Sequence, residues 1–291
     1  MERIIDLSVS SLVAAGFYAA MAYGLGLIYG VLRVVNLTHG GVIMAAAYFT
    51  WVLFTSFSLD PYLSIPIVLV TFFGFGVALY LVFVRFLPRG AAGGVQSLLL
   101  LFGLWLIMRN IAYLIFKGNT RSIQTSYSTA SIDVLGTPIA GTRIILFLIA
   151  VASLVILHFM LTRTYLGRAI RAVAQNPDSC TLVGINVERI YMLTFGIGTA
   201  LAGLGGLFVA TIVGFNPETG AAELLKSFVV VVLGGLGSVV GIAIGALILS
   251  VAENFSILFM PFELTAAVGF VLLVLVLILR PGGLFGQKVL A

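Results

Sequence analysis

Charged residues, cysteine and histidine are all scarce in this chain of 291 residues. Only 9% of the residues are charged, and the chain has one cysteine, Cys180, and two histidines, His39 and His158. A single cysteine cannot form an internal disulfide. The sequence has no His-Glu-x-x-His pair, no Cys-x-x-Cys pair and no Gly-x4-Gly-Lys-Ser/Thr phosphate loop. These absences argue against a metal-dependent hydrolase and against ATP binding by this chain.

Hydrophobic residues, in contrast, make up 61% of the chain, whereas soluble domains contain roughly 45–50%. Apolar runs fall at about 8–31, 39–57, 61–86, 95–116, 142–161, 190–214, 224–252 and 257–279. A run of about 20 residues can cross the hydrocarbon of a bilayer as a helix. We therefore predict an all-α polytopic membrane protein of about eight apolar segments, with a single transmembrane domain over residues 1–291. Glu2 and Asp6 lie beside Arg3, so the start lacks the basic region of a cleaved signal peptide, and the first segment is expected to be retained.

Two of these apolar segments are interrupted, near 34–41 and 233–238. In the first break Asn36, Thr38 and His39 precede paired glycines, and in the second Gly234 and Gly235 divide an apolar run. Non-helical backbone at membrane depth is tolerated where protein or a water-filled cavity satisfies it, so we expect broken or re-entrant helices that line a translocation pathway or gate. For Asn36 and Thr38 a simpler role is capping of the following helix at the membrane interface.

The distribution of basic residues predicts which loops face the cytoplasm, because Lys and Arg accumulate in short cytoplasmic loops. Placing 162–189 inside also puts Arg33, Arg85 and Arg89 inside, and leaves the amino terminus and the loop 117–141 outside. Three further crossings would then put Arg280 outside. A re-entrant element over 224–252, with two half-length helices, restores the rule. The loop 117–141 is rich in Ser and Thr, which allows a short strand pair.

The polar stretch 162–189 carries the strongest local signals in the chain. Asn176 is a good helix N-cap, Pro177 suits the first helical position, and Gly184 can take the left-handed conformation that ends a helix. We predict an exposed helix over 177–183, too short to persist without a surface to lie on. The residues predicted to dock a separate subunit here are Arg168, Arg171, Asp178, Ser179, Cys180 and Gly184. Contact with lipid headgroups is an alternative role for the arginines.

Small residues recur at four-residue spacing in two apolar segments. One series is Gly198, Ala202 and Gly206, and the other continues from the second break through Gly241 and Gly245. Small faces of this kind let transmembrane helices approach closely, so close packing, within the bundle or to a second membrane subunit, is the expected role. Arg109 falls within a predicted span, where its long side chain is expected to reach outward to the interface.

Four blocks of sequence resemble the permease subunits of bacterial ABC importers for branched-chain amino acids. These are GLGLIYGVLRVVNLTHGGVIMAAAY at 24–48, GRAIRAVAQNPDSCTLVGINVERI at 167–190, KSFVVVVLGGLGSVVGIAIGALILSVAE at 226–253, and RPGGLFG at 280–286. The segment Asp-Ser-Cys-Thr-Leu-Val-Gly at 178–184 is similar to the Glu-Ala-Ala-x-x-x-Gly pattern with which importer permeases dock on their ATPases. Asp, Ser and Cys replace its first three residues.

The resemblance implies a multi-pass protein of the bacterial inner membrane that works with several partners. These are two ABC ATPase subunits, a related second permease or a second copy of this chain, a periplasmic substrate-binding protein and membrane lipid, with no nucleic acid. The chain itself is expected to bind no cofactor and to catalyse nothing, since ATP and Mg²⁺ would be bound by the ATPases. The same family machinery also serves urea, short amides and other amino acids. A self-sufficient secondary transporter or channel is a further alternative, although it would be expected to carry paired intramembrane acids.

Overall fold

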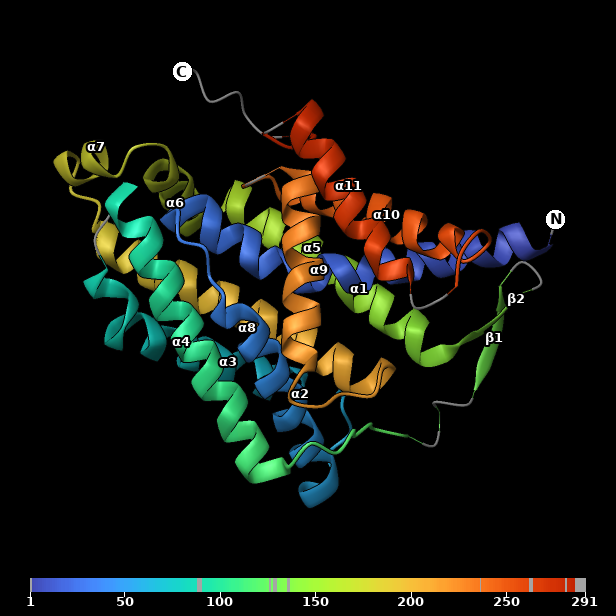
Figure 1. Ribbon diagram of the computed structural model, residues 1–291. Coiled ribbons are helices and arrows are strands. Elements are labelled where there is room, and N and C mark those ends of the chain that lie inside the picture. The colour runs from blue at the N-terminus through green and yellow to red at the C-terminus, as the bar shows by residue number, and fades with distance from the viewer. Residues whose placement is uncertain are drawn as a thin grey trace.

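The fold is a bundle of helices with one small β-hairpin, as seen in a computed structural model (Figure 1). The structure describes residues 2–87, 91–125, 127, 130–134, 137–235, 237–261, 264–280 and 282–285. Its helices are α1 (Glu2–Leu32), α2 (Thr38–Phe57), α3 (Ile65–Val82), α4 (Ala91–Phe116), α5 (Gly141–Arg163), α6 (Tyr165–Gln175), α7 (Pro177–Leu182), α8 (Val187–Ile212), α9 (Thr219–Gly234), α10 (Val239–Ser256) and α11 (Thr265–Leu279), with a 3₁₀ turn at Val84–Phe86. Arg89, predicted to face the cytoplasm, lies outside the described residues.

Seven of these helices are long and apolar enough to cross a membrane, namely α1, α2, α3, α4, α5, α8 and α10. The prediction of an all-α polytopic membrane protein is therefore confirmed. Two of the predicted segments differ in length from the helices that form. The last apolar run yields only the 15-residue α11, and the run 224–252 divides into α9 and α10. Helix α9 begins at Thr219, before the predicted run, and has 16 residues, while α10 has 18. Both helices are therefore longer than the two half-length helices that were predicted from the run 224–252.

Helix α8 is the centre of the bundle. In its most apolar window 83% of the residues are buried, whereas the corresponding value for α4 is 17%. Helices α1, α2 and α3 all pack against α8, and glycines bring their backbones together. A Cβ atom on Gly206 would lie 2.2 Å from the carbonyl oxygen of Ile43 in α2, and one on Gly24 of α1 would lie 2.1 Å from that of Gly198. The predicted packing role of the small residues in α8 is confirmed.

The β-hairpin lies within the loop 117–141, where a short strand pair was predicted. Strands β1 (Ser131–Val134) and β2 (Thr137–Ala140) pair antiparallel, with Ser131 opposite Ala140 and Val134 opposite Thr137. The hairpin leads directly into α5 and lies near the amino-terminal end of α1 (Figure 1). Helix α6 packs against the other end of α1, and α7 follows α6 at that same end of the bundle (Figure 1). The predicted cytoplasmic and periplasmic loops are therefore well separated in space.

Candidate functional site

Helix α6 is strongly amphipathic and lies across the end of the bundle that carries α7. Its N-cap is Thr164, whose hydroxyl oxygen accepts a hydrogen bond from the Gly167 amide at 3.0 Å. The face buried against the bundle consists of Gly167, Ala169, Ile170 and Val173. The intervening positions Arg168 and Arg171 are exposed, so both predicted docking arginines project from the outer face of α6.

Helix α7 has the caps that the sequence predicts. The Asn176 side chain accepts a hydrogen bond from the Ser179 amide at 2.9 Å, and Pro177 occupies the first helical position. The helix ends at Leu182, one residue before the predicted end. Gly184 has φ +80°, a conformation that residues with a Cβ rarely adopt. The next helix is capped in the same way, since Asn186 accepts from the Arg189 amide at 2.9 Å.

The surface that α7 presents is more apolar than predicted. Leu182 and Val183, at the end of the helix, are 87% and 74% exposed. Asp178, Ser179 and Gly184 are also exposed, whereas Cys180 is 5% exposed and lies on the face of α7 that is buried against the bundle. Of the predicted docking residues, Arg168, Arg171, Asp178, Ser179 and Gly184 therefore share the exposed surface, and Cys180 anchors α7 to the bundle. Leu182 and Val183 were missed. Helical spacing puts Leu182, two residues after Cys180, on the side away from it, whereas Val183 follows the last residue of the helix.

The first predicted break is real, but its polar residues do not cap a helix at an interface. The N-cap of α2 is Leu37 and has no side-chain hydrogen bond; instead the Thr38 hydroxyl donates to the Asn36 side chain. Asn36, Thr38 and His39 are all buried. His39 Nε2 donates to the Met21 carbonyl oxygen at 2.8 Å, and Met21 lies eleven residues before the end of α1. The capping hypothesis is wrong because α2 starts deep inside the bundle.

His39 is consequently a buried polar group at a helix junction. Its Nδ1 has no hydrogen-bond partner among the described residues. A Cβ on Gly24 would lie 3.1 Å from the His39 ring, and one on Gly40 would lie 2.1 Å from the carbonyl oxygen of Gly220 in α9. Helices α1, α2, α8 and α9 therefore converge around the first break.

The second break is a tight turn between α9 and α10. Gly235 and Gly237 have φ +94° and +88°, and a Cβ on Gly234 would lie 2.3 Å from the Gly241 carbonyl oxygen. The amide of Leu284 donates to the Leu233 carbonyl at 3.0 Å, so the segment after α11 closes over this turn. Leu236, inside the predicted break, lies outside the described residues.

The two predicted pathway groups do not touch each other. The first packs against α1 at Met21 and Gly24, whereas the turn packs at Gly30, where Gly237 approaches closely. At 1.5 Å per residue, these positions are roughly 9–14 Å apart along α1. The structure thus places the two groups of predicted pathway residues against α1 at two levels.

Two polar contacts were missed because α9 begins earlier than predicted. The stretch 219–224, which lies between the apolar runs 190–214 and 224–252, is helical. Glu218, just before it, accepts hydrogen bonds at Oε1 from Arg109 Nε at 2.9 Å and from the Tyr113 hydroxyl at 2.7 Å. Arg109 therefore has a specific acidic partner beyond its predicted reach to the interface. Glu223, one turn further, is buried beside Lys226.

Comparison with known proteins gives matches over nearly the whole chain. Residues 7–279 match the family described as "Branched-chain amino acid transport system / permease component". The chain is 29% identical over 290 residues to the high-affinity branched-chain amino acid transport system permease protein BraD of Pseudomonas aeruginosa, covering 96% of this chain and 94% of BraD. It is 27% identical over 285 residues to the corresponding protein LivH of Salmonella typhimurium, covering 93% and 91%.

A second kind of permease matches over a shorter region. The permease protein LivM of Escherichia coli, named for the same kind of transport system, is 34% identical over 146 residues, which cover 48% of this chain and 34% of LivM. No solved structure matches this chain.

Proposed function

We propose that this chain, which belongs to the family of permease components of branched-chain amino acid transport systems, forms the membrane passage of an ATP-driven importer for aliphatic amino acids in a bacterial inner membrane. The observation that carries the proposal is the exposed, capped helix α7 at one end of a bundle with seven candidate spans. A passage lined mainly by small and apolar residues suits a zwitterion with an apolar side chain.

Helix α7 is the part of the chain that a cytoplasmic ATPase would hold. Its exposed Leu182 and Val183 are unfavourable in water, and covering one such side chain is worth about 1.5–3 kcal/mol. Asp178 lies in the first turn, and Arg168 and Arg171 project from the neighbouring α6. An apolar patch with charged neighbours is typical of a docking surface, and Gly184 and Ser179 complete it.

ATP and Mg²⁺ would be bound by the partner subunits. Within the part of the chain that the structure describes, no group of three or more His, Cys, Asp or Glu residues is placed to hold a metal ion. ATP-driven closure of two ATPase subunits would move α7 and, through α6 and α8, the bundle. Such coupling needs two states of the bundle that ATP binding stabilises differently. A loaded periplasmic binding protein would deliver the amino acid at the end with the β-hairpin.

The second half of the membrane domain would be a related permease. The match to both LivH and LivM, two permeases named for one kind of system, supports a pair of unlike chains. Two copies of this chain are the alternative. Co-expression of two differently tagged copies of this chain with a companion permease distinguishes them, because only a pair of like chains recovers both tags together.

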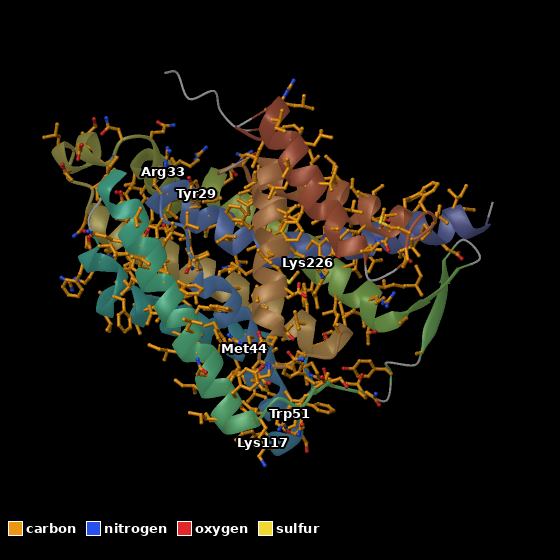
Figure 2. All side chains as sticks on the ribbon, viewed as in Figure 1. Tyr29, Arg33, Met44, Trp51, Lys117 and Lys226 are labelled. Atoms are coloured by element: carbon orange, nitrogen blue, oxygen red, sulfur yellow. The ribbon has the colours of Figure 1, made fainter. Side chains whose placement is uncertain are left out.

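The proposal is tested by replacing Asp178 with Arg and, separately, Gly184 with Pro, in the chain co-expressed with its ATPases. Both variants are expected to insert into the membrane at the wild-type level and to recover much less ATPase on purification. Lys117→Glu is the matched control, because it reverses a charge at the opposite end of the bundle (Figure 2), and it should recover ATPase normally. Unchanged ATPase recovery with Asp178→Arg would contradict the docking role.

A transport measurement tests the rest of the proposed function. Reconstituted vesicles with the full set of partners should accumulate leucine only when ATP and the loaded binding protein are both present. Uptake by this chain alone, without nucleotide or companion proteins, would favour the secondary transporter.

A further inference from the structure

Four titratable side chains from three helices meet where α9 crosses α1. Glu223 and Lys226 come from α9, Tyr18 from the middle of α1, and Glu253 from the last turns of α10. Lys226 Nζ lies 3.6 Å from Glu223 Oε1 and 5.3 Å from the centroid of the Tyr18 ring. The Tyr18 hydroxyl donates to Glu253 Oε2 at 2.5 Å. Figure 2 labels Lys226 beside α9 at this crossing. We call these four residues the α9 cluster.

The α9 cluster contains one more carboxylate than ammonium. Glu253 accepts a hydrogen bond from Tyr18, and Glu223 Oε1 is paired with Lys226. The other oxygen of Glu223, Oε2, is buried and has no hydrogen-bond partner among the described residues, and the side chain as a whole is only 7% exposed. A buried carboxylate oxygen without a donor is costly in an apolar bundle. Its charge and its free acceptor position would both be satisfied by a cationic N–H donor.

We propose that the Glu223 carboxylate receives the ammonium group of the amino acid in transit, with Lys226 beside it for the carboxylate group. This inference rests on the proposed function, since it assigns to the importer the site that handles the charged end of its substrate. Glu223 Oε2 supplies the acceptor, and Lys226 is 32% exposed in its side chain, so the α9 cluster opens toward the surface on the Lys226 side.

Access to Glu223 requires α9 to move away from α1. In the conformation described here Glu223 Oε2 is covered. The glycine turn after α9 can act as a hinge, because Gly235 and Gly237 have no Cβ and can adopt a wide range of backbone conformations. At the other end Gly220 lies against Gly40 of α2 with no intervening side chain. A rotation of α9 in the transport cycle would therefore expose the carboxylate at one stage and cover it at another, as alternating access requires.

The test is radiolabelled leucine uptake by vesicles that contain the complete importer, with ATP hydrolysis measured in the same preparation. Glu223→Gln keeps the shape and removes the charge. We expect leucine uptake to fall by about tenfold or more, while ATP hydrolysis stimulated by the loaded binding protein stays within about twofold of wild type, because α7 and its docking surface are untouched. Glu223→Asp should retain part of the uptake. Asp6→Asn removes a carboxylate near the start of α1, about 18 Å along the helix from Tyr18 of the α9 cluster; it is the control and should transport normally.

A second variant separates substrate binding from simple charge balance. Glu223→Gln/Lys226→Met removes both charges, so the bundle no longer holds an unpaired ammonium even if Glu223→Gln alone fails to fold. We expect the double variant to remain defective in uptake. Recovery of uptake in it would overturn the proposal, as would wild-type uptake by Glu223→Gln, or uptake and ATP hydrolysis falling in proportion.

The same experiment separates this inference from the proposed function. If wild-type vesicles move leucine without nucleotide, the importer proposal fails. In that case the role of Glu223 is still supported if Glu223→Gln lowers the nucleotide-independent leucine flux by about tenfold. The role of Glu223 is contradicted if that flux is unchanged.

Discussion

Asn176 and Gly184 fix the two ends of α7 by different physical effects. Asn176 supplies a side-chain acceptor for a free amide at the start of the helix, a contribution of about 1 kcal/mol. Gly184 supplies no contact at all, since a Cβ placed there would meet nothing within 4 Å. Its contribution is the backbone conformation itself, φ +80°.

Gly184→Ala therefore tests backbone strain alone. The left-handed conformation costs a residue with a Cβ about 1–2 kcal/mol, so we expect faster amide hydrogen exchange in residues 178–185. Gly74→Ala is the matched control, because a Cβ there also meets nothing within 4 Å but the residue is helical; it should be neutral or slightly stabilising. Equal exchange in the two variants would show that the conformation of Gly184 does not limit α7.

At the scale of helices, glycines in α8 set how closely the bundle packs. Gly206→Ala would place a methyl group against α2, because a Cβ atom on residue 206 would lie only 2.2 Å from the Ile43 carbonyl oxygen. Overpacking of this kind costs about 1–3 kcal/mol, so the detergent-solubilised protein should melt several degrees lower. Gly103→Ala in α4, where a Cβ meets nothing within 4 Å, should leave the melting temperature unchanged or raise it. A drop in both variants would point to a general effect of alanine in these helices.

The contact between α4 and the start of α9 should depend on pH. Hydrogen bonds from Tyr113 and Arg109 hold the pKa of Glu218 below its ordinary value of 4.5. Because the folded pKa is depressed, the contact stabilises the fold above that value and is lost as the pH falls through the folded pKa. Thermal stability of the wild type should therefore decline more steeply than that of Glu218→Gln on acidification below about pH 4.5. Parallel declines would mean that Glu218 makes no net contribution.

Capping residues and glycines in the sequence predicted where helices end, but they did not predict how deeply a helix end is buried in the bundle. The caps at Asn176 and Asn186, the turn at Gly184 and the break before Gly235 follow from side-chain chemistry and backbone freedom within a few residues. The position of Asn36 and Thr38 depends on long-range packing, because the chain after α1 folds back into the bundle before α2 starts. No local pattern encodes that reversal, so the same residues fit an interfacial cap equally well.

The α9 cluster was not predicted from the sequence for the same reason, namely that it depends on long-range packing. Glu223 and Lys226 are three residues apart at the start of the predicted apolar run 224–252, while Glu253 lies just after its end. Only the packing of α9 and α10 against α1 brings them to Tyr18. Pairing of residues more than 200 positions apart could not be predicted from one sequence without contact information.

At the scale of the whole molecule, the bundle has two distinct ends. Arg33 lies at the end with α6, and Lys117 at the opposite end with Trp51 (Figure 2). This arrangement supports the sidedness predicted from the basic residues. In a Cys180→Ser background, we expect a cysteine at Arg168 to react with a membrane-impermeant maleimide only in inverted vesicles, and one at Lys117 only in intact, right-side-out preparations. Labelling of both from the same face would rule out this topology.

The reactivity of the Cys180 thiol reports movement of α7 in the unmodified protein. It is the sole thiol of the chain and lies on the buried face of α7, so a maleimide adduct on unmodified protein should form only when that helix moves away from the bundle. If an ATPase docks on α7 as proposed, the rate of alkylation should fall when the ATPase is bound and change across the nucleotide cycle, and this can be measured without any engineered substitution.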